Sequence, residues 1–215
     1  MAKIQLPEWI PLFPLPNVVF FPKTYLPLHI FEPRYCRMVE EALAADRMIG
    51  MVLLREGWEQ EYDRNPPIYE IGSVGRIVRF QRFDDGKYDV ILYGLKRFTV
   101  RDENFERPYR QAKIDILAEA VAQPLPELLK QNLVELLTQF YDELNGGEEM
   151  ESILELGLED EALIATLAAG LPFTVLEKQF LLEAETLYRR SRRLADLIQL
   201  RLHAIPGGQE NDAES

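Results

Sequence analysis

Prolines crowd the first 33 residues of the chain, and they constrain its fold more than any other feature of the sequence. Seven of the 14 prolines lie there, at Pro7, Pro11, Pro14, Pro16, Pro22, Pro27 and Pro33. Proline lacks a backbone N–H and biases the preceding residue away from helical dihedrals, so this stretch is predicted to form edge strands and turns. The residues between the prolines are mostly large and apolar, which indicates that the segment is buried. The alternation of Leu26, Leu28 and Ile30 predicts one half-buried strand.

The next stretch of the chain reads mainly as β-structure. Pro33 suits the first turn of a helix, and apolar side chains at helical spacing extend that helix over residues 33–45. A continuous apolar run over residues 48–54 has the length of a buried strand. Residues 68–118 alternate in strand fashion, with a hairpin turn at residues 84–87 and a bulge or bend at Gly94. We expect a mostly antiparallel sheet or barrel with one short helix.

The period of the apolar pattern changes to that of a helix after Pro124 and Pro126. Four helices are predicted, over residues 128–144, 160–169, 174–185 and 187–204. Thr174 and Glu177 form a capping-box pair at the start of the third. The fold class is therefore α+β, with a β pseudo-barrel followed by a helical bundle. We predict subdomains at 1–120 and 121–208 and a disordered tail at 209–215.

Net charge follows the same division. The chain carries a formal charge of −12, of which residues 1–120 contribute −1 and residues 121–215 contribute −11. A sequence pI near 4.8 disfavours a protein built around the phosphate backbone of nucleic acids. No apolar run reaches the length of a membrane span, and the N-terminus does not resemble a signal peptide. With Cys36 as its single cysteine, we expect a soluble, acidic, cytoplasmic protein.

Catalytic and metal-binding motifs are not found in the sequence. Its two histidines, His29 and His203, are far apart and neither lies near another candidate metal ligand. The common zinc, metalloprotease and phosphate-loop patterns do not occur. We predict that the protein is not an enzyme and needs no cofactor or metal.

Two clusters of charge have simple interpretations. Acidic residues gather between Asp142 and Glu161, where no calcium-loop spacing occurs, and we interpret them as a solvated face. Four arginines between Arg189 and Arg193 are expected to pair with the acidic helices rather than with RNA.

The run from Ile10 to Tyr35, with its closing Phe31-Glu32-Pro33-Arg34-Tyr35, is far from generic. It resembles the opening signature of the Lon N-terminal (substrate-binding) domain family, in its stand-alone form. The resemblance continues through residues 72–79 and 93–98, and it returns in the helical half at residues 161–172 and 176–183. It implies a PUA-like β pseudo-barrel followed by a helical bundle.

The resemblance also implies a role in substrate recognition ahead of proteolysis. Full-length Lon proteases continue into an ATPase module and a Ser-Lys protease domain, and neither activity carries over to these 215 residues. The implied partners are unfolded or degron-bearing polypeptides and a Lon-type protease, which the protein would serve as an adaptor or holder. By alignment with the motif, Glu32, Arg34 and Arg37 are candidate peptide-binding residues. The alternative is that these residues only form the helix start and its ion pairs.

A second reading places the protein among RNA-associated modules, because PUA-like barrels elsewhere bind RNA and a fold does not fix a function. The cations that could gather on one edge of the sheet for this purpose are Arg76, Arg79, Arg82, Lys87, Lys96, Arg97 and Arg101.

Overall fold

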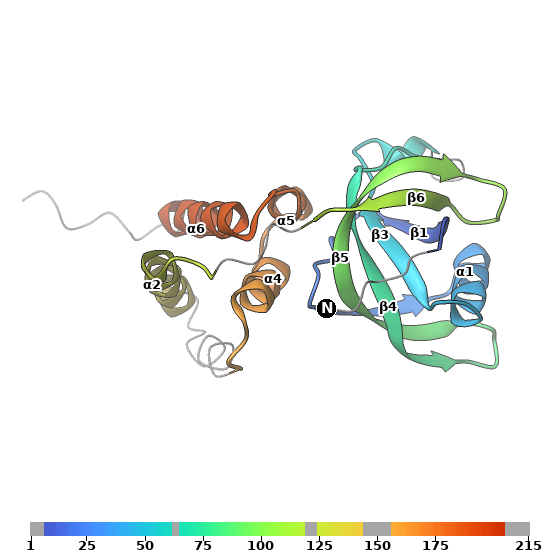
Figure 1. The fold of residues 1–215 in the computed structure, drawn as a ribbon, viewed down its shortest axis with the longest axis horizontal. Coiled ribbons are helices and arrows are strands. Elements are labelled where there is room, and N and C mark those ends of the chain that lie inside the picture. Colours follow the sequence, from blue (N-terminus) through green and yellow to red (C-terminus); the bar gives the residue numbers. More distant parts are fainter. Residues whose placement is uncertain (1–6, 62–64, 119–123, 144–155, 205–215) are drawn as a thin grey trace, which may run out of the picture. The chain divides into compact units, whose positions relative to one another are not determined.

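The structure is a computed structural model. It describes four stretches of the chain, residues 7–61, 65–118, 124–143 and 156–204 (Figure 1). Contacts divide the chain into two compact units. The sheet unit comprises Met1–Ala118 and Ala169–Glu183, and the helical unit comprises Glu119–Ala168 and Ala184–Ser215.

Six strands form the sheet: β1 (Ile10–Leu15), β2 (Tyr25–Ile30), β3 (Met48–Leu53), β4 (Ile71–Arg82), β5 (Tyr88–Asn104) and β6 (Gln111–Ile116). Their order is β2-β5-β4-β3-β1-β6, and β5 also pairs with β6. Strands β1, β3, β4, β5 and β6 therefore close into a ring, and β2 extends it at one edge. Only the β1–β3 pair is parallel among the strands described, which confirms the mostly antiparallel sheet.

Strand β5 is long enough to pair with two strands along one edge, β2 and then β6. Its first part pairs with β2, from Tyr88 opposite Ile30 to Tyr93 opposite Tyr25. Its second part pairs with β6, from Phe98 opposite Ile116 onward. A proline in β2 fits this arrangement, since Pro27 lies on an edge strand, where a missing N–H is tolerated.

The turn and the bulge predicted in the sheet are both present. Gly86 has φ +84° in the β4–β5 hairpin, a conformation that side chains with a Cβ rarely adopt. The register between β4 and β5 shifts beside Gly75, which pairs with Gly94, while Val74 pairs with Lys96. A Cβ at Gly94 would collide with the Phe21 carbonyl, so glycine is required there.

Helix α1 (Pro33–Leu43) covers one part of the sheet. Its buried side chains Met38 and Val39 join a core cluster with Ile49 and Met51 of β3. Alternate residues of β3 contribute to a second cluster, which explains why all six residues of this strand are buried. The helix and the buried strand thus lie where the sequence predicted them.

The four helices predicted in the second half also form: α2 (Glu127–Glu143), α4 (Asp160–Gly170), α5 (Val175–Leu182) and α6 (Leu187–Ala204). The capping box predicted for α5 is complete, because Thr174 accepts from the Glu177 N–H and Glu177 accepts from the Thr174 N–H. Helices α2 and α6 pack against each other in the helical unit. A bundle of all four helices stays a prediction, and the tail lies outside the described residues.

Helix α5 belongs to the sheet unit, and three residues that we call the α5 junction attach it: Arg97, Gln179 and Leu182. The guanidinium of Arg97 donates to the Leu182 carbonyl at 2.8 Å, at the C-terminal end of α5. The amide of Gln179 donates to the Ile71 carbonyl of β4 at 3.0 Å. The contact-based division therefore differs from the predicted subdomains at residues 169–183.

No helix in the described part of the chain is long and apolar enough to span a membrane.

Candidate functional site

A pocket of about 200 Å³ opens in the sheet unit where α1 begins. We call it the arginine pocket. Strand β1, the start of α1, the connection from β3 to β4 and the β5–β6 loop contribute its described lining residues: Pro14, Arg34, Tyr35, Leu54, Asn65, Pro66, Phe105, Arg107, Pro108, Tyr109 and Arg110. Four segments distant in sequence thus meet at one concave site, which is the usual form of a binding site.

One of the three predicted peptide-binding residues, Arg34, lines this pocket directly. Its Nε donates to a carboxylate oxygen of Glu32 at 3.0 Å, and its guanidinium lies 4.6 Å from the centre of the Tyr35 ring. Glu32 is the N-cap residue of α1, although its side chain caps no backbone N–H. The helix start and its ion pair therefore fix how Arg34 is presented at the pocket.

The third predicted residue, Arg37, is not a lining residue but is connected to the pocket through Glu41. Arg37 Nε donates to Glu41 at 2.7 Å, one helical turn along α1. The same carboxylate accepts a 2.6 Å hydrogen bond from the Tyr109 hydroxyl and lies 3.2 Å from Arg107. Glu41 therefore ties the β5–β6 loop, which forms one wall of the pocket, to α1.

The contacts between Glu41, Tyr109 and the nearby arginines shift the pKa values of Glu41 and Tyr109. Hydrogen bonding to Tyr109 and the nearby arginines hold the pKa of Glu41 below its usual range, so it stays charged near neutral pH. Burial and the Glu41 carboxylate raise the pKa of Tyr109 to about 12. The pair thus keeps one form, carboxylate and neutral phenol, across the physiological range.

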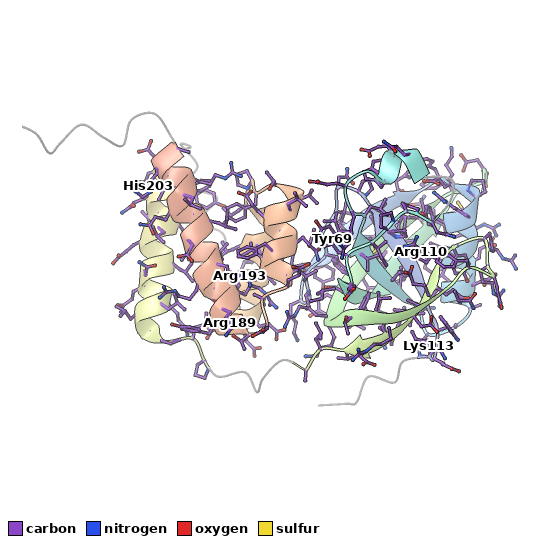
Figure 2. The ribbon with its side chains drawn as sticks, turned by 90° about the horizontal axis from the view of Figure 1, so that it is seen from above. Tyr69, Arg110, Lys113, Arg189, Arg193 and His203 are labelled. Carbon is purple, nitrogen blue, oxygen red and sulfur yellow. The ribbon has the colours of Figure 1, made fainter. Side chains whose placement is uncertain are left out.

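The most buried charge in the pocket wall is Arg110, which is 7% exposed and labelled in the sheet unit in Figure 2. It donates to the Pro66 carbonyl at 2.8 Å and lies 3.1 Å from a Glu103 carboxylate oxygen. Its guanidinium also lies 5.3 Å from the centre of the Phe105 ring, which is 46% exposed. Burial lowers the pKa of Arg110 more than Glu103 raises it.

The sequence interpretation missed the contribution of the β5–β6 loop. Residues 105–110 place two aromatic side chains, a proline and two arginines between two predicted strands, and such a loop is a candidate binding element. Only the closure of the sheet brings this loop to α1, so its partners could not be named from local pattern.

The cations considered for RNA binding are largely engaged within the protein. Arg97 is buried in the α5 junction, and Arg82, Lys87 and Arg101 have carboxylate partners in Glu40, Asp85 and Asp115 respectively. The structure lends no support to an RNA surface here.

Other candidates from the sequence also have structural partners. His29 lies 2.7 Å from Asp89 on the neighbouring strand. Among the described residues no group of three or more histidine, cysteine, aspartate or glutamate side chains could hold a metal ion. In the helical unit Arg189 pairs with Glu185 at 2.7 Å and Asp160 pairs with Lys130 at 2.9 Å. Four of the nine acidic residues between Asp142 and Glu161 lie outside the described residues: Glu148, Glu149, Glu151 and Glu155.

Comparison with known proteins identifies the family. The family model described as the ATP-dependent protease La (LON) substrate-binding domain matches residues 9–199. The chain belongs to the Lon substrate-binding domain family. The resemblance read from residues 10–35 is thereby confirmed.

Relatives of this Lon domain are proteases much longer than the chain itself. Lon protease 2 of Myxococcus xanthus is 28% identical over 205 residues, and the Lon protease of Anaeromyxobacter dehalogenans is 29% identical over 206 residues. Each match covers 91% of this chain but only 24% of the protease. The chain spans about a quarter of the length of these relatives, and the match is confined to that part.

Solved structures show the same fold. The crystal structure of a Lon N-terminal domain protein from Xanthomonas campestris has a TM-score of 0.66 at 22% identity, and it covers 87% of this chain and 97% of its own. The N-terminal domain of the Mycobacterium avium complex Lon protease has a TM-score of 0.67 at 18% identity, with 89% and 98% covered. The PUA-like description fits this mixed Lon-domain fold.

Proposed function

We propose that this protein is a non-catalytic polypeptide-recognition module that holds unfolded or degron-bearing chains, and that it acts as an adaptor for a Lon-type protease in the cytoplasm. Membership of the Lon substrate-binding domain family supports a recognition role. The matched region contains no ATPase or protease module, so we assign the protein no catalytic step of its own.

The observation that carries the proposal is the arginine pocket. It is concave, it combines aromatic, proline and guanidinium groups, and it includes one of the residues that the family resemblance pointed to. Pockets lined by apolar side chains with a few placed polar groups are typical of sites that take one side chain of a bound peptide.

Within the site we assign different roles to the three predicted residues. Arg34 contacts the polypeptide, because it lines the pocket and its side chain is 27% exposed. Glu32 is a positioning residue that orients Arg34 through their 3.0 Å pair. Arg37 is an indirect positioning residue. It pairs with Glu41, and Glu41 accepts a hydrogen bond from Tyr109 of the β5–β6 loop.

Fluorescence anisotropy with a labelled, permanently unfolded polypeptide tests this function. We expect saturable binding to the wild-type protein and a dissociation constant at least about fivefold larger for Arg34→Ala. Arg79→Ala is the matched control, since it removes the same charge from β4 and does not line the pocket. The control should change affinity by less than about twofold.

Absence of saturable binding by the wild-type protein at high micromolar concentration would contradict the recognition function. Equal losses in Arg34→Ala and Arg79→Ala would instead contradict the placement of the site, and would point to a general effect of positive charge.

A further inference from the structure

The wall of the arginine pocket has a charge opposite to that of the protein. The described residues that line it include three arginines, Arg34, Arg107 and Arg110, and no aspartate or glutamate. The chain as a whole carries a formal charge of −12. A concave, low-dielectric site lined by one sign of charge concentrates the potential of that sign at its mouth.

The carboxylates that pair with these arginines lie outside the described wall. Glu32, Glu41 and Glu103 each contact one of the three guanidinium groups, and none of them is a lining residue. These ion pairs hold the three arginines in place. A guanidinium has five N–H donors in a planar fork, so one carboxylate partner leaves donors for another.

The most buried of these arginines is incompletely compensated. Arg110 lies 3.1 Å from a Glu103 oxygen, yet that oxygen makes no well-aligned hydrogen bond among the described residues. Burial accordingly lowers the pKa of Arg110 despite the nearby carboxylate. A second anion within the pocket would offset this desolvation.

Apolar groups surround the charged wall. The Tyr35 ring is held against the Arg34 guanidinium, and the Phe105 ring is held against Arg110 while almost half of its surface remains exposed. Pro14, Pro66 and Pro108 supply further rigid apolar surface. A ligand that fits this lining has an anionic group next to an apolar one.

We propose that the arginine pocket binds a carboxylate of the captured polypeptide together with the apolar side chain next to it. This proposal rests on the recognition function above and names the chemistry that is selected. The carboxylate can be that of an internal aspartate or glutamate or that of the chain terminus, because both present the same planar pair of oxygens to a guanidinium.

A pair of small probes tests the pocket without requiring a whole polypeptide. N-acetylphenylalanine carries a carboxylate beside an aromatic ring, and N-acetylphenylalaninamide is its neutral match. In NMR titrations of the full chain we expect the acid to shift the side-chain resonances of Arg110 and Phe105, with at least about fivefold tighter binding than the amide. Higher salt should weaken the binding of the acid probe more than the binding of the amide probe.

Matched peptides then distinguish the two sources of the carboxylate. One series replaces an internal glutamate by glutamine, and the other replaces the free C-terminus by an amide. A loss of about fivefold or more in the first series identifies an internal acid, and in the second a terminal one. Equal affinities for acid and neutral members in both series would overturn the proposal.

Variants link the preference to the pocket. Arg110→Gln and Arg34→Gln remove a charge but keep an N–H donor, and each should reduce the preference for the acid probe over the amide. Arg34→Gln serves if the buried Arg110→Gln fails to fold. Unchanged preference in folded variants would overturn the assignment.

The failure of the proposed function is distinguishable from the failure of this inference. If the acid probe binds at Arg110 but no unfolded polypeptide binds, the anion pocket stands and the recognition function fails. If polypeptides bind and the probes do not discriminate, the recognition function stands and the carboxylate preference fails.

Discussion

Two arginines are buried in the described part of the sheet unit, Arg97 and Arg110, and their guanidinium groups play different roles. In the α5 junction, Arg97 is 1% exposed and donates to a main-chain carbonyl that ends a helix. In the arginine pocket, Arg110 is 7% exposed and lies in the wall of an open cavity. A guanidinium in a closed junction stabilises the fold, whereas one beside a cavity is also accessible to a ligand.

This comparison predicts the largest loss of stability for Arg97→Ala. The substitution leaves the Leu182 carbonyl without its charged donor and creates a cavity, so the free energy of unfolding should fall by about 3 kcal/mol. Urea denaturation followed by circular dichroism measures it. Arg97→Met should cost less, because its side chain fills much of the space.

Arg110→Ala is expected to have a smaller effect on stability and a larger one on binding. Water can enter the open pocket and hydrate the Pro66 carbonyl and Glu103, so the loss should be about 1–2 kcal/mol. Affinity for an acidic peptide should fall at least about tenfold. Equal losses of stability in Arg97→Ala and Arg110→Ala would contradict the proposed difference between the two regions. A loss of affinity in Arg97→Ala as large as that in Arg110→Ala would contradict it as well.

Tyr109→Phe tests the hydrogen bond between Tyr109 in the pocket wall and Glu41 of α1. Loss of the hydrogen bond to Glu41 should lower the free energy of unfolding by about 1–2 kcal/mol near neutral pH. The pKa of Tyr109 is about 12 in the folded protein, above that of an unfolded tyrosine. The stabilisation is therefore complete below about pH 10 and is lost as pH rises toward 12.

The difference between wild type and Tyr109→Phe should thus narrow by about 1 kcal/mol between about pH 8 and about pH 11. Urea midpoints at the two pH values measure this change. A constant difference would mean that Tyr109 does not keep its proton in the folded state.

Arg37→Ala should have the smallest effect. Its side chain is 59% exposed, and its ion pair with Glu41 is of the weakly stabilising surface kind. We expect no measurable change in urea midpoint and a loss of affinity below about threefold, because Tyr109 and Arg107 still hold Glu41. A loss as large as that of Arg34→Ala would make Arg37 a contact residue.

Structural features formed by residues close together in the sequence could be predicted. Contacts that form only when the sheet closes could not. The capping box of α5 needs only Thr174 and Glu177, three residues apart, and the β4–β5 turn needs only Gly86 and its neighbours. Arg97 looked like one of several sheet cations, because its partner Leu182 is 85 residues away. Sequence pattern carries no information about such a partner.

The candidate site divides in the same way. Arg34 could be named because the motif that contains it is contiguous, and Glu32 because it is two residues away. Arg110 and Phe105 could not, since they reach α1 only when β6 returns beside β1. The attachment of α5 to the sheet unit is likewise a matter of two side chains meeting distant carbonyls.

Closure of the strand ring has a consequence for how the protein is made. Ile10 pairs with Ala112, so β1 has no partner on that side until β6 has left the ribosome. Strand β3 can pair with the other edge of β1 earlier, but the edge that faces β6 stays unpaired while about a hundred further residues are synthesised, and such long-range closure is slow. A nascent chain halted before β6 would therefore display the same kind of apolar, extended polypeptide that its finished form is proposed to bind.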